Sequence, residues 1–72
     1  MDIKVRIGKH LKGLRQGKGL TQEKLSFEAE IDKTYISEVE NGKRNISVVN
    51  LEKLIVTLGS TVQDFFNHKD FE

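Results

Sequence analysis

The 72-residue sequence contains no cysteine, no proline and no long apolar run. Without cysteine the chain can form neither a disulfide nor a thiolate metal site. This absence excludes the small secreted scaffolds that depend on disulfides, and it favours a reducing cytosol. No segment approaches the ~20 apolar residues of a membrane span, and the N-terminal residues lack the apolar core of a signal peptide. We therefore expect a cytoplasmic protein.

The chain also lacks a strong net charge, which is only +1 at pH 7. A chain of this length builds one small domain with a modest core. Its charges are unevenly placed: basic residues dominate from Lys4 to Lys18, and acidic residues concentrate from Glu23 to Glu40. Such an asymmetry can orient a protein on a polyanion such as DNA, although a solvated face is its more common cause.

Apolar residues recur at helical spacing along most of the chain. Ile7, Leu11 and Leu14, for example, fall on one face of a helix. The two-residue alternation that is typical of strands is missing. The pattern therefore predicts an all-α domain of five short helices. They are expected over residues 3–16, 22–29, 33–40 and 48–58, with a short fifth helix from residue 62.

Start signals support these helices. Ser, Thr and Asp are good N-caps because their side chains accept hydrogen bonds from free backbone N–H groups. Such residues precede four of the expected helices, as Thr21, Asp32, Ser47 and Thr61. We expect one domain over residues 1–72, with its core at 5–66. Residues 67–72 look like a polar tail that frays unless Phe71 docks.

The second and third expected helices are separated only by residues 30–32. Two short helices across so short a turn form a helix-turn-helix arrangement. Its second helix fits the major groove of DNA, and the N-terminal residues of that helix reach the base edges. The apolar positions Ala29, Ile31, Ile36 and Val39 face inward. The outward positions that remain are Lys33, Thr34, Ser37 and Glu38.

Three segments carry a family resemblance: GLTQEKL at 19–25, IDKTYISEVENGKRNIS at 31–47 and LEKLIVTLG at 51–59. Together they resemble the Xre family, the lambda-repressor-like helix-turn-helix domains, over about residues 5–66. The DKTYIS and GKRNIS stretches are also similar to the small controller proteins of restriction–modification systems. The resemblance implies a compact five-helix fold and a transcriptional regulator that binds a pseudo-palindromic DNA operator as a homodimer.

The resemblance also implies roles for individual residues in binding double-stranded DNA. The base-reading positions are Lys33, Thr34, Ser37 and Glu38. Lysine can donate to guanine, threonine can contact a thymine methyl group, and glutamate can accept from cytosine. Phosphate contacts are implied for Thr21, Gln22, Tyr35, Asn41, Lys43, Arg44 and Asn45. The alternatives are plain solvation of these side chains, a structural role for Tyr35, and helix termination by Asn41.

Two further features follow from the same resemblance. Arg15 and Glu40 match an ion pair that ties the first helix to the end of the third. Glu30 stands where the family's turn usually has glycine. If that position requires a positive φ angle, a glutamate there costs about 1 kcal/mol or more.

A homodimer needs an interface, and the fourth and fifth helices offer apolar residues for it. The candidates are Val49, Ile55, Val56, Phe65 and Phe66. More apolar surface is available there than a small core obviously needs, so part of it should form an isologous patch. The alternative is ordinary core packing.

Other function classes have less support. A protein-interaction module, such as an antitoxin or anti-repressor, could reuse the fold, and the acidic Glu38 and Glu40 fit that alternative. An enzyme is not expected, because no nucleophile–base pair, metal cluster or phosphate loop stands out. The two histidines, His10 and His68, lie far apart in sequence and are expected on the surface without a metal. No cofactor is expected.

Overall fold

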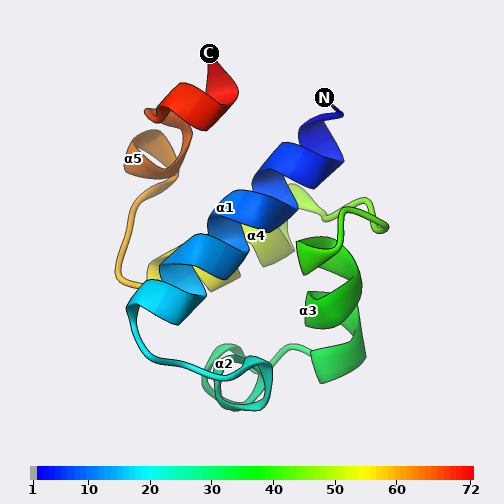
Figure 1. Ribbon diagram of the computed structural model, residues 1–72. Helices are drawn as coiled ribbons and strands as arrows, with labels where there is room; N and C mark the ends of the chain where they lie inside the picture. Colours follow the sequence, from blue (N-terminus) through cyan, green and yellow to red (C-terminus); the bar gives the residue numbers. More distant parts are fainter. Residues whose placement is uncertain (1) are drawn as a thin grey trace.

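The computed structural model describes residues 2–72, and helices are the regular elements in this range (Figure 1). The elements are α1 Ile3–Gly17, α2 Gln22–Ala29, α3 Lys33–Glu40, α4 Val48–Thr57, α5 Val62–Phe66 and a final 3₁₀ turn, η1 Lys69–Phe71. The expected all-α architecture is confirmed, with helix ends within one residue of the predicted ones for the first four helices. Among the described helices, none combines the length and apolarity needed to cross a membrane.

The predicted N-caps are all present. The side-chain oxygens of Thr21, Ser47 and Thr61 accept hydrogen bonds from the backbone N–H three residues later, at 3.0–3.1 Å. Asp32 accepts from the Thr34 N–H at 2.8 Å. Each cap satisfies a donor that the helix leaves free, and such a cap is worth about 1 kcal/mol. Local sequence therefore sets the starts of these four helices.

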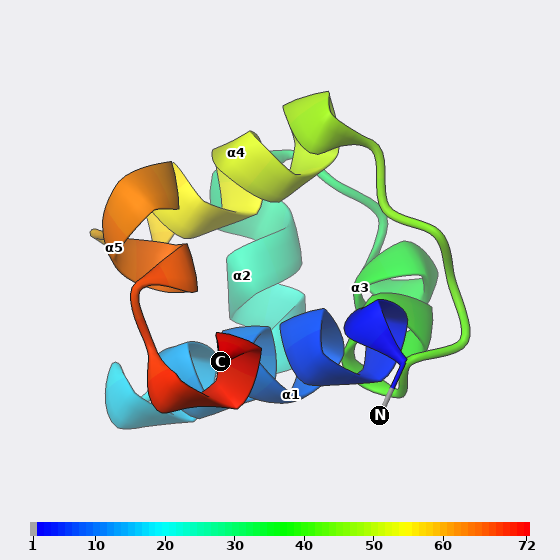
Figure 2. The same cartoon turned by 90° about the horizontal axis from the view of Figure 1, so that it is seen from above.

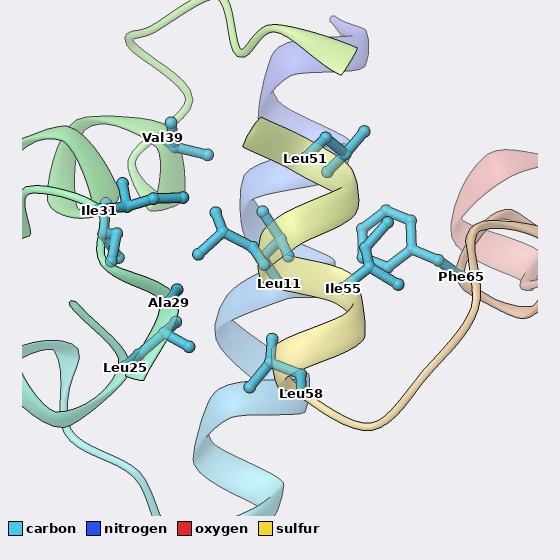
Figure 3. Packing of buried hydrophobic residues seen from close by; sticks show 11 residues of the cluster. Leu11, Leu25, Ala29, Ile31, Val39, Leu51, Ile55, Leu58 and Phe65 are labelled. Atoms are coloured by element: carbon cyan, nitrogen blue, oxygen red, sulfur yellow. The ribbon is translucent and has the colours of Figure 1, made fainter. Parts of the chain in front are cut away.

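One hydrophobic cluster joins all five helices. Figure 3 shows Leu11 of α1 at its centre, between Leu25 of α2 and Ile55 of α4. α3 lies beside the N-terminal half of α1, and α5 lies toward its C-terminal half (Figure 2). The core thus places α2 and α3 at one end of the molecule and α5 with the C-terminal turn at the other.

Two of the five expected dimer residues belong to this core. Ile55 and Phe65 are 0% and 1% exposed, so they cannot form a surface patch as the sequence suggested. Ile55 lies on the face of α4 that packs against α2 and α5, and Phe65 is the buried residue through which α5 joins the core. Val49 and Val56 remain 70% and 61% exposed, and Phe66 lies at the surface.

The C-terminal residues do not form a frayed tail. Phe71 docks, with its ring centroid 5.5 Å from that of Phe65 and 4.9 Å from that of Phe66. His10 and His68 are also not isolated surface residues, because their ring centroids lie 4.4 Å apart. His10 is partly buried against the same aromatic cluster. Burial, and then the neighbouring His68, lower the pKa of His10 against the opposing effect of Asp70.

Candidate nucleic-acid interface

The turn between α2 and α3 is closed by a left-handed residue. Glu30 has φ 56° and ψ 43°, and it is the only non-glycine residue with positive φ among residues 2–72. The suspected strain at this position is therefore real. The turn is held by the Ile31 N–H, which donates to the Ser26 carbonyl at 3.1 Å, and by the Ser26 hydroxyl, which donates to the Ile31 carbonyl. Buried Ile31 anchors the turn to the core.

α3 presents its first turn to solvent. Ile36 and Val39 bury its inner face, while Asp32 caps its N-terminus. Lys33 and Thr34 are exposed, and Ser37 and Glu38 are partly exposed. Because residues three and four apart share a helix face, the buried pair fixes which side chains point outward. The outward set is the one expected from the sequence.

A buried polar network fixes the base of this unit. The Arg15 Nε and Nη2 groups donate to the two carboxylate oxygens of Glu40 at 2.7 and 2.9 Å. The Arg15 Nη1 group donates to the Leu20 carbonyl at 2.7 Å. Hydrogen bonding to Glu40 raises the pKa of Arg15 although burial opposes it. The expected Arg–Glu pair thus connects α1 to the end of α3.

Gln22 extends this network through a hydrogen bond that was not predicted from the sequence. Its side-chain Nε2 donates to Glu40 at 3.0 Å, and this bond fixes the amide at the start of α2. An amide NH₂ has two donors, so one N–H of Gln22 remains for another partner. Thr21, Gln22 and Lys33 line one open depression between the N-termini of α2 and α3.

The loop after α3 holds a second set of contacts. Arg44 donates to Glu38 at 2.8 Å, and its guanidinium carbon lies 4.7 Å from the ring centroid of Tyr35. The Asn50 amide donates to the Tyr35 hydroxyl at 3.3 Å. Two residues expected to contact DNA, Glu38 and Arg44, are therefore paired with each other. Such an exposed pair contributes little to stability.

The remaining loop residues divide into two groups. The Asn41 amide donates to the Ser37 carbonyl at 2.9 Å, so this side chain closes the last turn of α3. Lys43 and Asn45 are exposed. The loop thus adds one exposed ammonium group and one exposed amide beside the outward face of α3.

Comparison with known proteins shows which family has this arrangement of helices. A family model described as helix-turn-helix matches residues 11–65. The chain is 49% identical over 67 residues to the control protein C.MunI of a Mycoplasma species. This match covers 92% of this chain and 90% of that protein. The chain belongs to the helix-turn-helix family.

Solved structures of helix-turn-helix proteins agree with this membership. The restriction–modification controller protein C.AhdI from Aeromonas hydrophila has a TM-score of 0.83 and 41% identity, covering 88% of this chain and 96% of that one. The controller protein C.Esp1396I, solved as a tetramer in complex with its natural 35 base-pair operator, has a TM-score of 0.85 and 32% identity. That match covers 92% of this chain and 87% of that one.

Two contacts that position the helix-turn-helix unit have no signal in the sequence. One is the Gln22–Glu40 hydrogen bond, which joins residues on different helices. The other is the close approach of α1 to α3 at Gly8. A Cβ atom at Gly8 would lie 2.9 Å from the Glu40 carbonyl oxygen and closer still to that of Val39. Helix interiors usually disfavour glycine, and here the contact between the two backbones requires it.

Proposed function

We propose that this chain is a sequence-specific transcriptional regulator of the restriction–modification controller type, which binds operator DNA as a homodimer with α3 in the major groove. The main structural support for this function is the exposed first turn of α3, which belongs to a rigidly anchored helix-turn-helix unit. Its relatives include control proteins that match 92% and 88% of the chain. The proposed activity is binding rather than catalysis, and the cytoplasm is the compartment where a bacterial regulator meets its operator.

Base reading is assigned to the outward face of α3. Lys33 and Thr34 stand in the first turn, which is the part of a recognition helix that reaches deepest into the groove. Lysine suits the O6 and N7 acceptors of guanine, and threonine suits the methyl group of thymine. Ser37 lies one turn further along, and Glu38 could accept from cytosine when DNA draws Arg44 away.

Phosphate contacts are assigned to the two edges of this face. On one edge, Thr21 and Gln22 stand at the N-terminus of α2, and Gln22 keeps one N–H free of Glu40. On the other edge, Lys43 and Asn45 extend from the loop, and Arg44 can exchange Glu38 for a phosphate. The Tyr35 ring packs against the Arg44 guanidinium. Asn41 closes the last turn of α3, where the loop begins. Such contacts supply position and salt-dependent affinity rather than sequence preference.

The homodimer is assigned to the exposed apolar side of α4 and α5. Val49 and Val56 lie seven residues apart, so they share one face of α4. Phe66 of α5 adds an aromatic ring at 36% exposure. A two-fold axis through this patch would relate two copies of α3, and dimeric helix-turn-helix proteins read half-sites about 34 Å apart, one helical turn of DNA.

Selection of binding sites from random DNA duplexes tests this function. We expect a pseudo-palindromic site that binds two chains, and an affinity that falls steeply with salt concentration. The variant Val56→Glu should weaken binding to the full site because it places like charges across the two-fold axis. Recovery of no site, together with a flat salt dependence, would contradict the proposal.

A further inference from the structure

Three potential metal ligands meet where the C-terminal turn lies against the middle of α1. His10 comes from α1, and His68 and Asp70 come from the C-terminal turn, which lies against α1 (Figure 2). The Asp70 carboxylate oxygen Oδ2 lies 3.8 Å from His10 Nδ1 and 3.4 Å from His68 Nδ1. One ligand atom from each residue lies within 4.8 Å of the others.

These separations are close to those of a zinc site. Zinc binds nitrogen and oxygen ligands at about 2.0–2.2 Å in a tetrahedron, so two of its ligand atoms are about 3.3 Å apart. The two distances that involve Asp70 differ from that value by about 0.1 and 0.5 Å. The imidazole ligand atoms of His10 and His68 lie within 4.8 Å of each other, and rotation of the exposed His68 side chain would bring the three ligand atoms onto one ion.

The surroundings fit a site with one open position. The His10 ring is held edge-on by Phe65 and Phe71, at centroid distances of 4.7 and 5.5 Å. This packing fixes the ring at the buried side. The side chains of His68 and Asp70 remain 40% and 29% exposed, which leaves a path for the ion and room for a water ligand. Two imidazoles, one carboxylate and one water are a common zinc ligand set.

We propose that His10, His68 and Asp70 bind one divalent transition-metal ion, with zinc as the best fit, and that the ion fastens the C-terminal turn to α1. His68 Nδ1 now accepts a hydrogen bond from the Asp70 backbone N–H at 3.1 Å. Metal binding either replaces this bond or uses Nε2 of the same ring. The site is formed by residues outside the helix-turn-helix unit, so the proposal of metal binding does not depend on the proposal of DNA binding.

Titration of the untagged, chelator-treated protein with zinc chloride tests the site. We expect saturable binding of one ion per chain by calorimetry, and joint shifts of the His10 and His68 imidazole signals in NMR spectra. At zinc concentrations about a hundredfold above Kd, the Tm should rise by about 10–20 °C, and a chelator should reverse the rise. Magnesium should produce no shift, because it prefers oxygen ligands.

Substitutions distinguish zinc binding at these three residues from adventitious zinc binding elsewhere on the surface. His68→Gln and Asp70→Asn change exposed side chains, and each should weaken zinc binding at least tenfold. His10→Phe keeps an aromatic ring in the cluster and should do the same. Glu72→Gln removes a nearby carboxylate outside the site and should leave affinity unchanged. Zinc binding that survives Asp70→Asn, that shifts only the His68 signals, or that is absent at millimolar zinc would overturn the proposal.

Discussion

The two ends of the molecule are stabilised by different kinds of side chain. At the end that carries α2 and α3, a buried Arg15–Glu40 pair with Gln22 attached holds polar groups in defined positions. At the C-terminal end, aromatic rings from α5 and η1 pack on His10. A charged network is sensitive to the loss of one partner, whereas an aromatic cluster loses stability in proportion to the area removed. Substitutions at the two ends should therefore lower the free energy of unfolding by different amounts.

The largest effect is expected at Glu40. The variant Glu40→Ala leaves the buried guanidinium of Arg15 without its partner, and it should lower the free energy of unfolding by about 3–5 kcal/mol. Chemical denaturation measures this loss. Glu23→Ala, an exposed carboxylate on α2, is the matched control and should change stability by less than about 0.5 kcal/mol. Equal effects at the two positions would show that the pair is not buried in solution.

A smaller loss is expected where α1 meets α3. Gly8→Ala forces a methyl group against two carbonyl oxygens of α3 and should cost about 1–3 kcal/mol. Gly13→Ala lies in the same helix with no heavy atom within 4 Å of the added Cβ. It should stabilise the protein by about 0.8–1 kcal/mol through helix propensity. Thermal unfolding of both variants measures the difference, and stabilisation by Gly8→Ala would refute the close approach.

The smallest of these losses is expected at the C-terminal end. Phe71 is only partly buried, so Phe71→Ala should cost about 1–2 kcal/mol and increase proteolysis after residue 66. Phe27 is 83% exposed, and Phe27→Ala provides a control with a near-zero effect on stability. If Phe71→Ala matches that control, η1 does not dock in solution.

The sequence predicted local features well because local residues determine them. Thr21, Asp32, Ser47 and Thr61 cap helices through hydrogen bonds that stay within three residues. For these caps the information lies within one turn of the chain. At Glu30 the family's usual glycine indicated only what a positive φ would cost, and the structure has φ 56° there.

Tertiary contacts were predicted less well. Ile55 and Phe65 were assigned to an interface because the fourth and fifth helices together carry more apolar residues than a small core obviously needs. Periodicity does not reveal which of these residues the rest of the protein covers. His10 and His68 lie far apart in sequence, and the packing of the C-terminal turn against α1 brings their rings together. The Gln22–Glu40 bond depends in the same way on how α2 and α3 pack.

We propose that the first turn of α3 reads bases while the loop after it contacts phosphates. Affinities of Lys33→Ala and Lys43→Ala for a selected operator and its single-base variants distinguish these two roles, with Lys69→Ala at the opposite end as the charge-matched control. Lys33→Ala should lose about 1–3 kcal/mol of discrimination at one position of each half-site. Lys43→Ala should weaken all sites alike and reduce the salt dependence by about one charge. A uniform loss for both variants, with base preference unchanged in Lys33→Ala, would show that Lys33 does not read bases.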